Sequence, residues 1–212
     1  MTPRSVHKDK LHGLYVITDE NLISEDNFEN AIESALRGGA RIIQYRDKSG
    51  NLEKRHKQAR ALHALCQKYQ ATSIINDDIE LAKAVNADGV HLGKNDADLS
   101  SARQTLGNDA IIGVSCYNDI SLALHAEENQ ADYIAFGAIF SSSTKPDAVV
   151  AGLGIIAKAR QQLNLPICTI GGITEKNIQQ VIQRGATMTA VISSVFSAKD
   201  IKQTTINLNQ YF

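Results

Sequence analysis

The sequence has few cysteines, almost no excess of either charge, and no long apolar segment. Cys66, Cys116 and Cys168 are odd in number, widely spaced and without a CxxC pair, which argues against a disulfide framework or a zinc site. Lys and Arg total 22 against 23 Asp and Glu, giving a net charge of -1. This balance provides no long-range field for nucleic acid or a membrane surface, so a bound anion must be held by a local cluster.

The chain also lacks targeting and linker segments. Its first thirteen residues carry charges but no apolar run, so we expect neither a signal peptide nor a membrane anchor, and a cytoplasmic location. The 212 residues, with 43% hydrophobic and 21% charged side chains, have the composition of a globular domain. We expect one domain over residues 1–212, with residues 1–13 as an N-terminal extension. The sequence is equally compatible with a monomer and a homo-oligomer.

Short β-branched runs alternate with longer amphipathic segments along the whole chain, which is typical of a parallel sheet with crossover helices. An open sheet and a closed barrel both fit this alternation. Polar residues follow nearly every run, as expected where strand ends converge on the mouth of a barrel, and no GxGxxG or Walker loop follows a strand. We therefore predict an α/β protein with a single-domain (β/α)8 TIM barrel fold. Its expected strands are Leu14–Thr18, Arg41–Arg46, Thr72–Asn76, Gly89–Leu92, Ile111–Ser115, Tyr133–Phe136, Ile167–Ile170 and Met188–Ile192.

The end of the second predicted strand carries one amide and two cations. Side chains alternate along a strand, so Gln44, Arg46 and Lys48 are predicted to share a face. On the lumen side, Arg46 and Lys48 would suit a phosphate or diphosphate, and Gln44 would suit the edge of a heterocycle. The same residues also fit a solvated strand end.

Carboxylates follow the third and fourth strands. Asp77 and Asp96, on neighbouring loops, have the hard oxygen atoms that Mg²⁺ uses when a substrate diphosphate completes its coordination. Asp78 comes directly before a helical run and is interpreted as an N-cap instead. Asn76 lies beside this group.

Further anion sites are predicted near the other strand ends. Gly172 and the turn at Ile192 and Ser193 follow the seventh and eighth strands, where backbone N–H groups and a helix N-terminus commonly bind phosphate. In the polar segment 140–151, Thr144 and Lys145 are candidates for a lid over a diphosphate, although the segment taken alone is better explained as a solvated loop.

The remaining polar candidates are ambiguous or structural. Ser115 is either a phosphate donor or a hydroxyl bonded to its own backbone. His91 has no metal-ligand spacing and is interpreted as a packed or hydrogen-bonded residue. Cys116 has no histidine partner placed by the sequence, so it is not taken as a nucleophile.

Taken together, these motifs resemble the thiamin-phosphate synthase family. They occur in the family's order from Leu14 to Val195, and each lies at a predicted strand end. The motifs are LYVITD, IIQYRDK, IINDD, GVHLGKND, IIGVSCYN, ADYIAFGAIF followed by STK, TIGGI and AVISS.

The resemblance implies a transferase that joins 4-amino-5-hydroxymethyl-2-methylpyrimidine diphosphate to 4-methyl-5-(2-hydroxyethyl)thiazole phosphate. Mg²⁺ is the implied cofactor and Asp77 and Asp96 its implied ligands. Arg46, Lys48, Ser115 and Lys145 are the implied catalytic contacts. The implied substrate-binding residues are these four together with Gln44, Asn76, Thr144, Gly172, Ile192 and Ser193.

The resemblance also implies a dissociative reaction, in which the diphosphate leaves first and the thiazole nitrogen captures the resulting cation. The absence of a convincing nucleophile agrees with this chemistry, since a leaving diphosphate needs cations where negative charge grows. Two alternatives stay open. A thiazole tautomerase of similar pattern needs no metal and relies on a histidine where Tyr117 stands, and a non-catalytic barrel could bind thiamin phosphates as a sensor.

Overall fold

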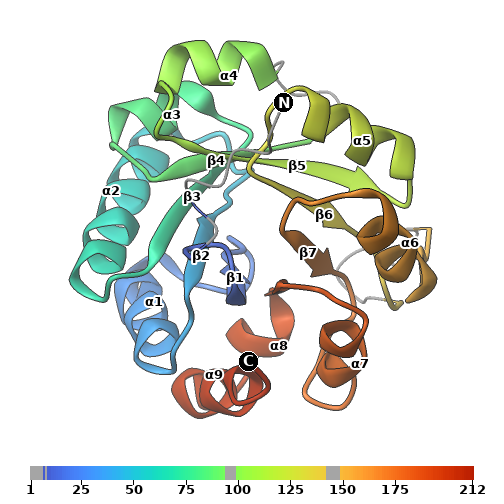
Figure 1. Cartoon of the computed structure of the whole chain (residues 1–212). Coiled ribbons are helices and arrows are strands. Elements are labelled where there is room, and N and C mark those ends of the chain that lie inside the picture. Colours follow the sequence, from blue (N-terminus) through green and yellow to red (C-terminus); the bar gives the residue numbers. More distant parts are fainter. Residues whose placement is uncertain (1–6, 8, 94–98, 142–148) are drawn as a thin grey trace.

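Eight parallel strands pair in chain order and close into a barrel (Figure 1). The structure, a computed structural model, describes residues 7, 9–93, 99–141 and 149–212. Closure is made by β1 and β8, in register from Gly13 opposite Met188 to Val16 opposite Val191. The predicted (β/α)8 TIM barrel is therefore confirmed. The strands are β1 (Gly13–Ile17), β2 (Ile42–Tyr45), β3 (Thr72–Asn76), β4 (Gly89–Leu92), β5 (Ile111–Tyr117), β6 (Tyr133–Phe136), β7 (Ile167–Ile170) and β8 (Met188–Val191).

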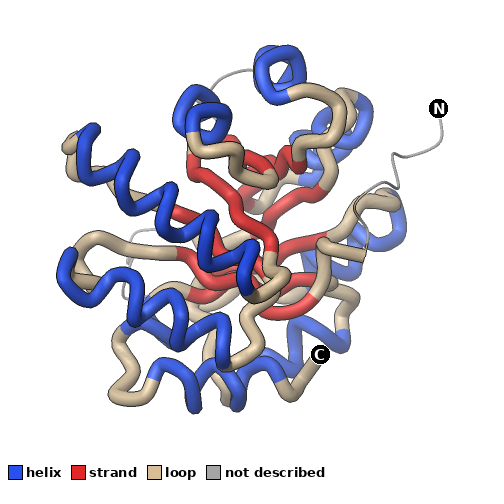
Figure 2. Tube along the Cα trace, turned by 90° about the vertical axis from the view of Figure 1, so that its left-hand side faces the viewer, coloured by secondary structure: helices blue, strands red, loops and turns tan. Residues whose placement is uncertain are grey.

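Helices surround the strands on the outside of the barrel (Figure 2). Several begin at side-chain caps: Asn51, Asp78, Asp119 and Asp200 each accept a hydrogen bond from a backbone N–H of the following turn, which satisfies a donor that has no intrahelical partner. The helical elements are η1 (Glu25–Asn27), α1 (Phe28–Arg37), α2 (Leu52–Lys68), α3 (Ile79–Ala84), α4 (Leu99–Leu106), α5 (Ile120–Glu128), α6 (Gly154–Gln162), α7 (Ile178–Gln183), α8 (Ser193–Phe196) and α9 (Ile201–Asn209).

Two separate apolar clusters stabilise this arrangement. The larger one lies between the strands and the helices, as expected for strands covered on their outer side. The smaller one includes Tyr15, Ile42, Ile74, Tyr133 and Met188, whose side chains point into the barrel. The lumen is thus filled by side chains, and polar chemistry is confined to its upper layer and the strand ends.

Four strands have the predicted bounds, whereas the predicted ends of β1, β2, β5 and β8 are wrong. β2 stops at Tyr45 because the Thr18 hydroxyl accepts a hydrogen bond from Arg46 N at 2.8 Å and donates one to Arg46 O at 2.9 Å. These bonds hold the Arg46 backbone outside the ladder. β5 continues to Tyr117 through a register shift against β6 that begins at Ser115.

Candidate active site

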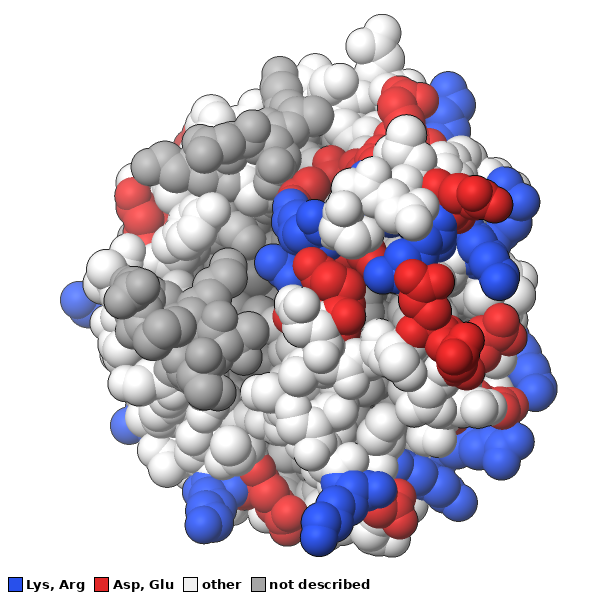
Figure 3. Space-filling model, turned by 180° about the vertical axis from the view of Figure 1, so that it is seen from behind, with Lys and Arg blue, Asp and Glu red and all other residues white. Residues whose placement is uncertain are grey.

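Charged side chains from the carboxyl ends of β1, β2 and β3 form one cluster. Figure 3 shows acidic and basic side chains crowded together near the middle of the face seen from behind. In a parallel barrel all carboxyl ends open onto the same mouth, so residues distant in sequence meet there. We call the group Asp19, Glu20, Arg46, Lys48 and Asp77 the mouth cluster.

Asp77 lies between a cation and an amide. Its Oδ2 atom is 2.5 Å from Lys48 Nζ and accepts a hydrogen bond from Asn76 Nδ2 at 2.6 Å. Its backbone has φ of 63°, a left-handed conformation that Asp tolerates better than most residues, and its N–H donates to His91 O at 2.8 Å. Asn76, Asp77 and Lys48, all predicted to bind the diphosphate and its metal, are therefore brought together.

Arg46 reaches the same mouth by a different route from the one predicted. Because β2 ends at Tyr45, strand alternation alone does not fix the side to which Arg46 and Lys48 point. The Arg46 guanidinium instead lies 3.8 Å from the Asp19 and the Glu20 carboxylates. Glu20 also accepts a hydrogen bond from Lys48 N at 3.1 Å, so one acidic residue holds both cationic residues at the mouth.

Gln44 does point into the lumen, as alternation predicts, and it begins a chain of hydrogen bonds. Gln44 Nε2 donates to the Tyr15 hydroxyl at 2.7 Å, which lies 2.9 Å from the Tyr133 hydroxyl. His91 Nδ1 is 2.9 Å from the Tyr133 hydroxyl, and His91 Nε2 is 2.9 Å from Ser115 Oγ. Ser115 therefore bonds a histidine side chain, which the sequence did not predict. We call these five residues the lumen relay.

Burial keeps the members of the lumen relay uncharged. It raises the pKa of Tyr15 and of Tyr133 well above the ordinary value. Burial also lowers the pKa of His91 to about 4, an effect that the Asp77 carboxylate only partly offsets. His91 is thus neutral at pH 7, with one donor and one acceptor nitrogen, which confirms its interpretation as a hydrogen-bonded residue.

The turn after β7 lies against the start of α8. Gly172 has φ of 65°, and a Cβ there would lie 2.3 Å from Ser141 O, so only glycine allows this approach. Ser194 Oγ donates to Ile173 O at 2.5 Å and joins the two turns. The N–H groups of Val195 and Phe196 donate hydrogen bonds to Ile192 O. The N–H groups of Ser193 and Ser194 come earlier in the first turn, where a helix provides no acceptor for them.

Neighbouring residues have structural roles. Asp78 accepts a hydrogen bond from Leu81 N at 2.8 Å and pairs with Arg55 at 2.7 Å, which confirms the predicted N-cap. Cys116 is buried, and burial raises the pKa of its thiol to about 12, so it is no nucleophile at neutral pH.

The predicted residues Asp96, Thr144 and Lys145 lie outside the described part of the chain.

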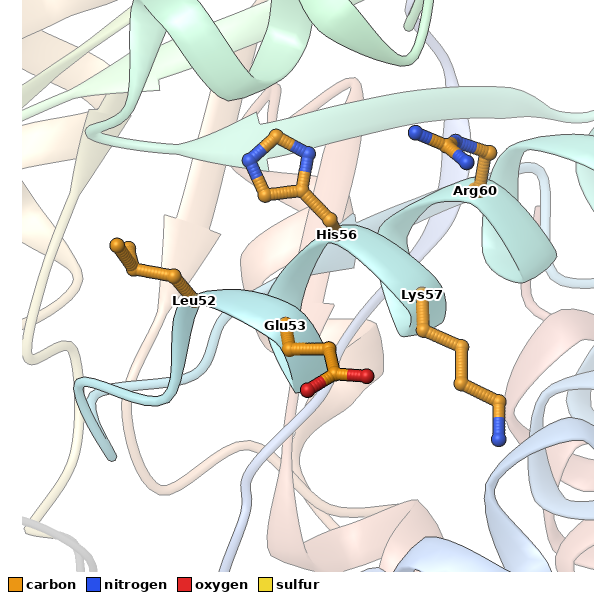
Figure 4. A pocket seen from close by; sticks show the side chains of 5 residues that line it. All are labelled: Leu52, Glu53, His56, Lys57 and Arg60. Atoms are coloured by element: carbon orange, nitrogen blue, oxygen red, sulfur yellow. The ribbon is translucent and has the colours of Figure 1, made fainter.

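A shallow depression on α2 is less suited to catalysis than the mouth of the barrel. Figure 4 shows the side chains that line it, which spread from a single helix, and it includes no residue of the mouth cluster. Substrate sites in barrels are built from several strand ends. The lining residues are Leu52, Glu53, His56, Lys57 and Arg60.

Asp77 fits a metal ion that arrives with its substrate, and the second predicted ligand, Asp96, lies outside the described residues. Among the described residues, no group of three or more His, Cys, Asp or Glu is arranged to hold a metal. Asp77 contributes a carboxylate at the mouth, within the bonding range of Asn76 and Lys48. Mg²⁺ commonly takes one or two carboxylates and completes its octahedron with substrate phosphates and water.

A closed (β/α)8 barrel with cations, acidic residues and glycine turns at one mouth defines a class of phosphate-handling barrel enzymes. Comparison with known proteins specifies the family. The thiamine monophosphate synthase family model matches residues 14–195, and the chain belongs to that family. The thiamine-phosphate synthase of Nitrosococcus oceani is 48% identical over 202 residues, covering 95% of this chain and 93% of that protein.

Further relatives agree with this assignment. The thiamine-phosphate synthase of Thioalkalivibrio sulfidiphilus is 48% identical over 192 residues, covering 91% of both chains. The solved thiamine phosphate pyrophosphorylase of Pyrococcus furiosus has a TM-score of 0.87 at 36% identity, covering 95% of both chains. The family resemblance drawn from the motifs is therefore confirmed, and the chain is an enzyme of the transferase class that acts on small molecules.

Proposed function

We propose that this chain joins 4-amino-5-hydroxymethyl-2-methylpyrimidine diphosphate to 4-methyl-5-(2-hydroxyethyl)thiazole phosphate. The bond between the pyrimidine's methylene carbon and the diphosphate oxygen breaks, and a bond from that carbon to the thiazole nitrogen forms. The products are thiamin phosphate and diphosphate. Family membership and the mouth cluster both support this assignment.

The single observation that carries the proposal is the contact of Lys48, Asn76 and Asp77 at the ends of neighbouring strands. Lys48 and Arg46 bind the leaving diphosphate, whose negative charge grows as the carbon–oxygen bond lengthens. Asn76 and Ser115 donate hydrogen bonds to its oxygen atoms. Lys145 takes part in the same binding.

Asp77 and Asp96 would hold Mg²⁺. The ion, when bound, neutralises charge on the diphosphate and so makes it a better leaving group. In the protein alone, Lys48 compensates the Asp77 carboxylate. With the diphosphate and its metal present, Lys48 would bind phosphate oxygens and Asp77 would help to hold the ion, in place of the Lys48–Asp77 pair.

The heterocycles occupy the rest of the mouth. Gln44, at the upper layer of the lumen, holds the pyrimidine. Thr144 and Gly172 bind on the thiazole phosphate side, and the N–H groups at Ile192 and Ser193 bind its phosphate. No protein nucleophile is required, because the aminopyrimidine itself carries the positive charge once diphosphate has left. The buried, protonated Cys116 thiol is consistent with that chemistry.

We also propose that the enzyme works as one domain over residues 1–212, with residues 1–13 as an N-terminal extension, and in the cytoplasm. No helix in the described part of the chain is long and apolar enough to cross a bilayer.

The test is an assay of the purified protein with both substrates and Mg²⁺. We expect thiamin phosphate and diphosphate to form in equal amounts, and neither to form when one substrate is omitted. Isomerisation of a thiazole phosphate without coupling would indicate a tautomerase instead. Tight binding of thiamin phosphate without turnover would indicate a sensor.

A further inference from the structure

The lumen relay crosses the interior of the barrel from β2 to β5. Gln44, Tyr15 and Tyr133 are 2%, 1% and 0% exposed, and His91 is 9% exposed. The His91 and Tyr133 rings stack at 25° with centroids 5.5 Å apart, and His91 Nδ1 lies 2.9 Å from the Tyr133 hydroxyl oxygen. Buried polar groups without partners are costly, so each proton in this chain needs an acceptor.

The need for an acceptor fixes which group donates in each hydrogen bond of the relay. Tyr15 accepts from Gln44 Nε2, so its own proton goes to the Tyr133 oxygen. Tyr133 then donates to His91 Nδ1, because any other arrangement leaves a buried phenol proton without an acceptor. His91 must carry its proton on Nε2 and donate it to Ser115 Oγ.

The hydrogen-bonding roles of the two end residues, Gln44 and Ser115, therefore depend on each other. The Ser115 hydroxyl already accepts a hydrogen bond from His91, so its own proton is available to an anion. Gln44 uses its amide nitrogen on Tyr15, and its Oε1 atom accepts no hydrogen bond from another described residue. One end of the relay presents an acceptor and the other presents a donor.

We propose that the lumen relay is a one-way hydrogen-bond chain that couples recognition of the pyrimidine's amino group at Gln44 to donation by Ser115 to the diphosphate. This inference rests on the proposed function. An oxo group in place of the amino group would require Gln44 to turn its amide nitrogen outward. Every link would then reverse, Ser115 would donate to His91 Nε2, and the diphosphate would lose a donor.

The barrel is built to hold the relay in place. A Cβ atom at Gly113 would lie 2.0 Å from Tyr133 Cζ and 2.4 Å from its hydroxyl oxygen. The Tyr133 ring therefore fits only because this position of β5 is a glycine. Tyr15 and Tyr133 are thus positioning residues that act through His91 and Ser115. They select the amino heterocycle by setting proton positions, in addition to any packing against it.

The first test measures the His91 tautomer by NMR on protein with ¹⁵N-labelled histidine and no added substrate, with the signals assigned by their loss in His91→Gln. We expect the proton on Nε2 and an Nδ1 atom that accepts a hydrogen bond. The Nδ1 signal should shift in Tyr133→Phe and stay unchanged in Tyr45→Phe. The latter is a matched control, because the Tyr45 hydroxyl bonds Gln58 outside the lumen. A proton on Nδ1 would overturn the relay.

The second test compares kcat/KM for the amino substrate and for its 4-oxo analogue, also as a diphosphate. Tyr133→Phe should reduce the preference for the amino form about tenfold, the effect of one hydrogen bond to a polar group. In a protein that already carries Ser115→Ala, adding Tyr133→Phe should lower kcat/KM for the amino substrate little further. Unchanged preference, or fully additive losses, would overturn the coupling. Absence of any turnover in the unmodified protein would instead contradict the proposed function, since the tautomer is measured without substrate.

Discussion

Lys48 Nζ and Asp77 Oδ2 lie 2.5 Å apart, which joins the loop after β2 to the end of β3. Each charge compensates the other while the mouth is open to water. Both side chains are partly exposed, at 53% and 26%, so the pair contributes little to stability and separates readily. This arrangement suits a site whose charges must change partners when a metal diphosphate binds.

Lys48→Ala is expected to lower kcat/KM for the pyrimidine diphosphate by roughly 100- to 1,000-fold, the range for loss of one group that stabilises developing negative charge. The melting temperature should change little, because a surface ion pair is worth at most about 1 kcal/mol. Steady-state kinetics and thermal unfolding measure both effects. Lys57→Ala, on the outer surface of α2 (Figure 4), is the matched control and should leave both unchanged.

Asp77 and Asp78 are adjacent carboxylates with different predicted roles. Asp77→Asn, which keeps a residue that tolerates the left-handed backbone at this position, should abolish most turnover and change the Mg²⁺ dependence while the free energy of unfolding stays nearly constant. Asp78→Ala should reduce the free energy of unfolding by about 1 kcal/mol, because it removes an N-cap, and should retain turnover. Equal activity in the two variants would contradict the assignment of Asp77 to the metal.

Gly113→Ala tests whether the Tyr133 ring needs the space above β5. The added methyl group would overlap that ring, and overpacking of this kind costs about 1–3 kcal/mol. Gly154→Ala at the start of α6 meets nothing within 4 Å and should be neutral or slightly stabilising, because alanine favours a helix. Urea unfolding compares the two. A stable Gly113→Ala variant with an undisturbed Tyr133 would contradict the packing described.

The three cysteines are expected to be unreactive in the folded protein. All are buried, and burial raises each thiol pKa, for Cys116 to about 12. Because these thiol pKa values lie above pH 9, raising the pH from 7 to 9 should create little thiolate and accelerate alkylation only slightly. A thiol reagent should therefore label three cysteines in denaturant and fewer than one in the native protein. Rapid native labelling would contradict this description of the core.

The sequence predicts the strands well because alternation and the turn residues are local signals. β3, β4, β6 and β7 have the predicted bounds, and Gln44 lies on the lumen face as alternation requires. Arg46 and Lys48 could not be placed in this way. The hydroxyl of Thr18, the residue that follows β1, holds the Arg46 backbone and ends β2 early.

The lumen relay could not be predicted from the sequence, because its contacts join strands that lie across the barrel. Tyr15 and Tyr133 are 118 positions apart along the chain. Each resembles an ordinary buried aromatic residue when its strand is considered alone. One usable signal is Gly113, a glycine inside a predicted strand, which commonly marks a close approach by another group.

A crystal structure with Mg²⁺ and the pyrimidine diphosphate would show whether charged side chains from separate strands meet around one polyanion. We expect diphosphate oxygens within hydrogen-bond distance of Arg46 and Lys48, with the ion on Asp77 and the Lys48–Asp77 pair separated. A diphosphate bound elsewhere, with that pair still intact, would rule out this arrangement.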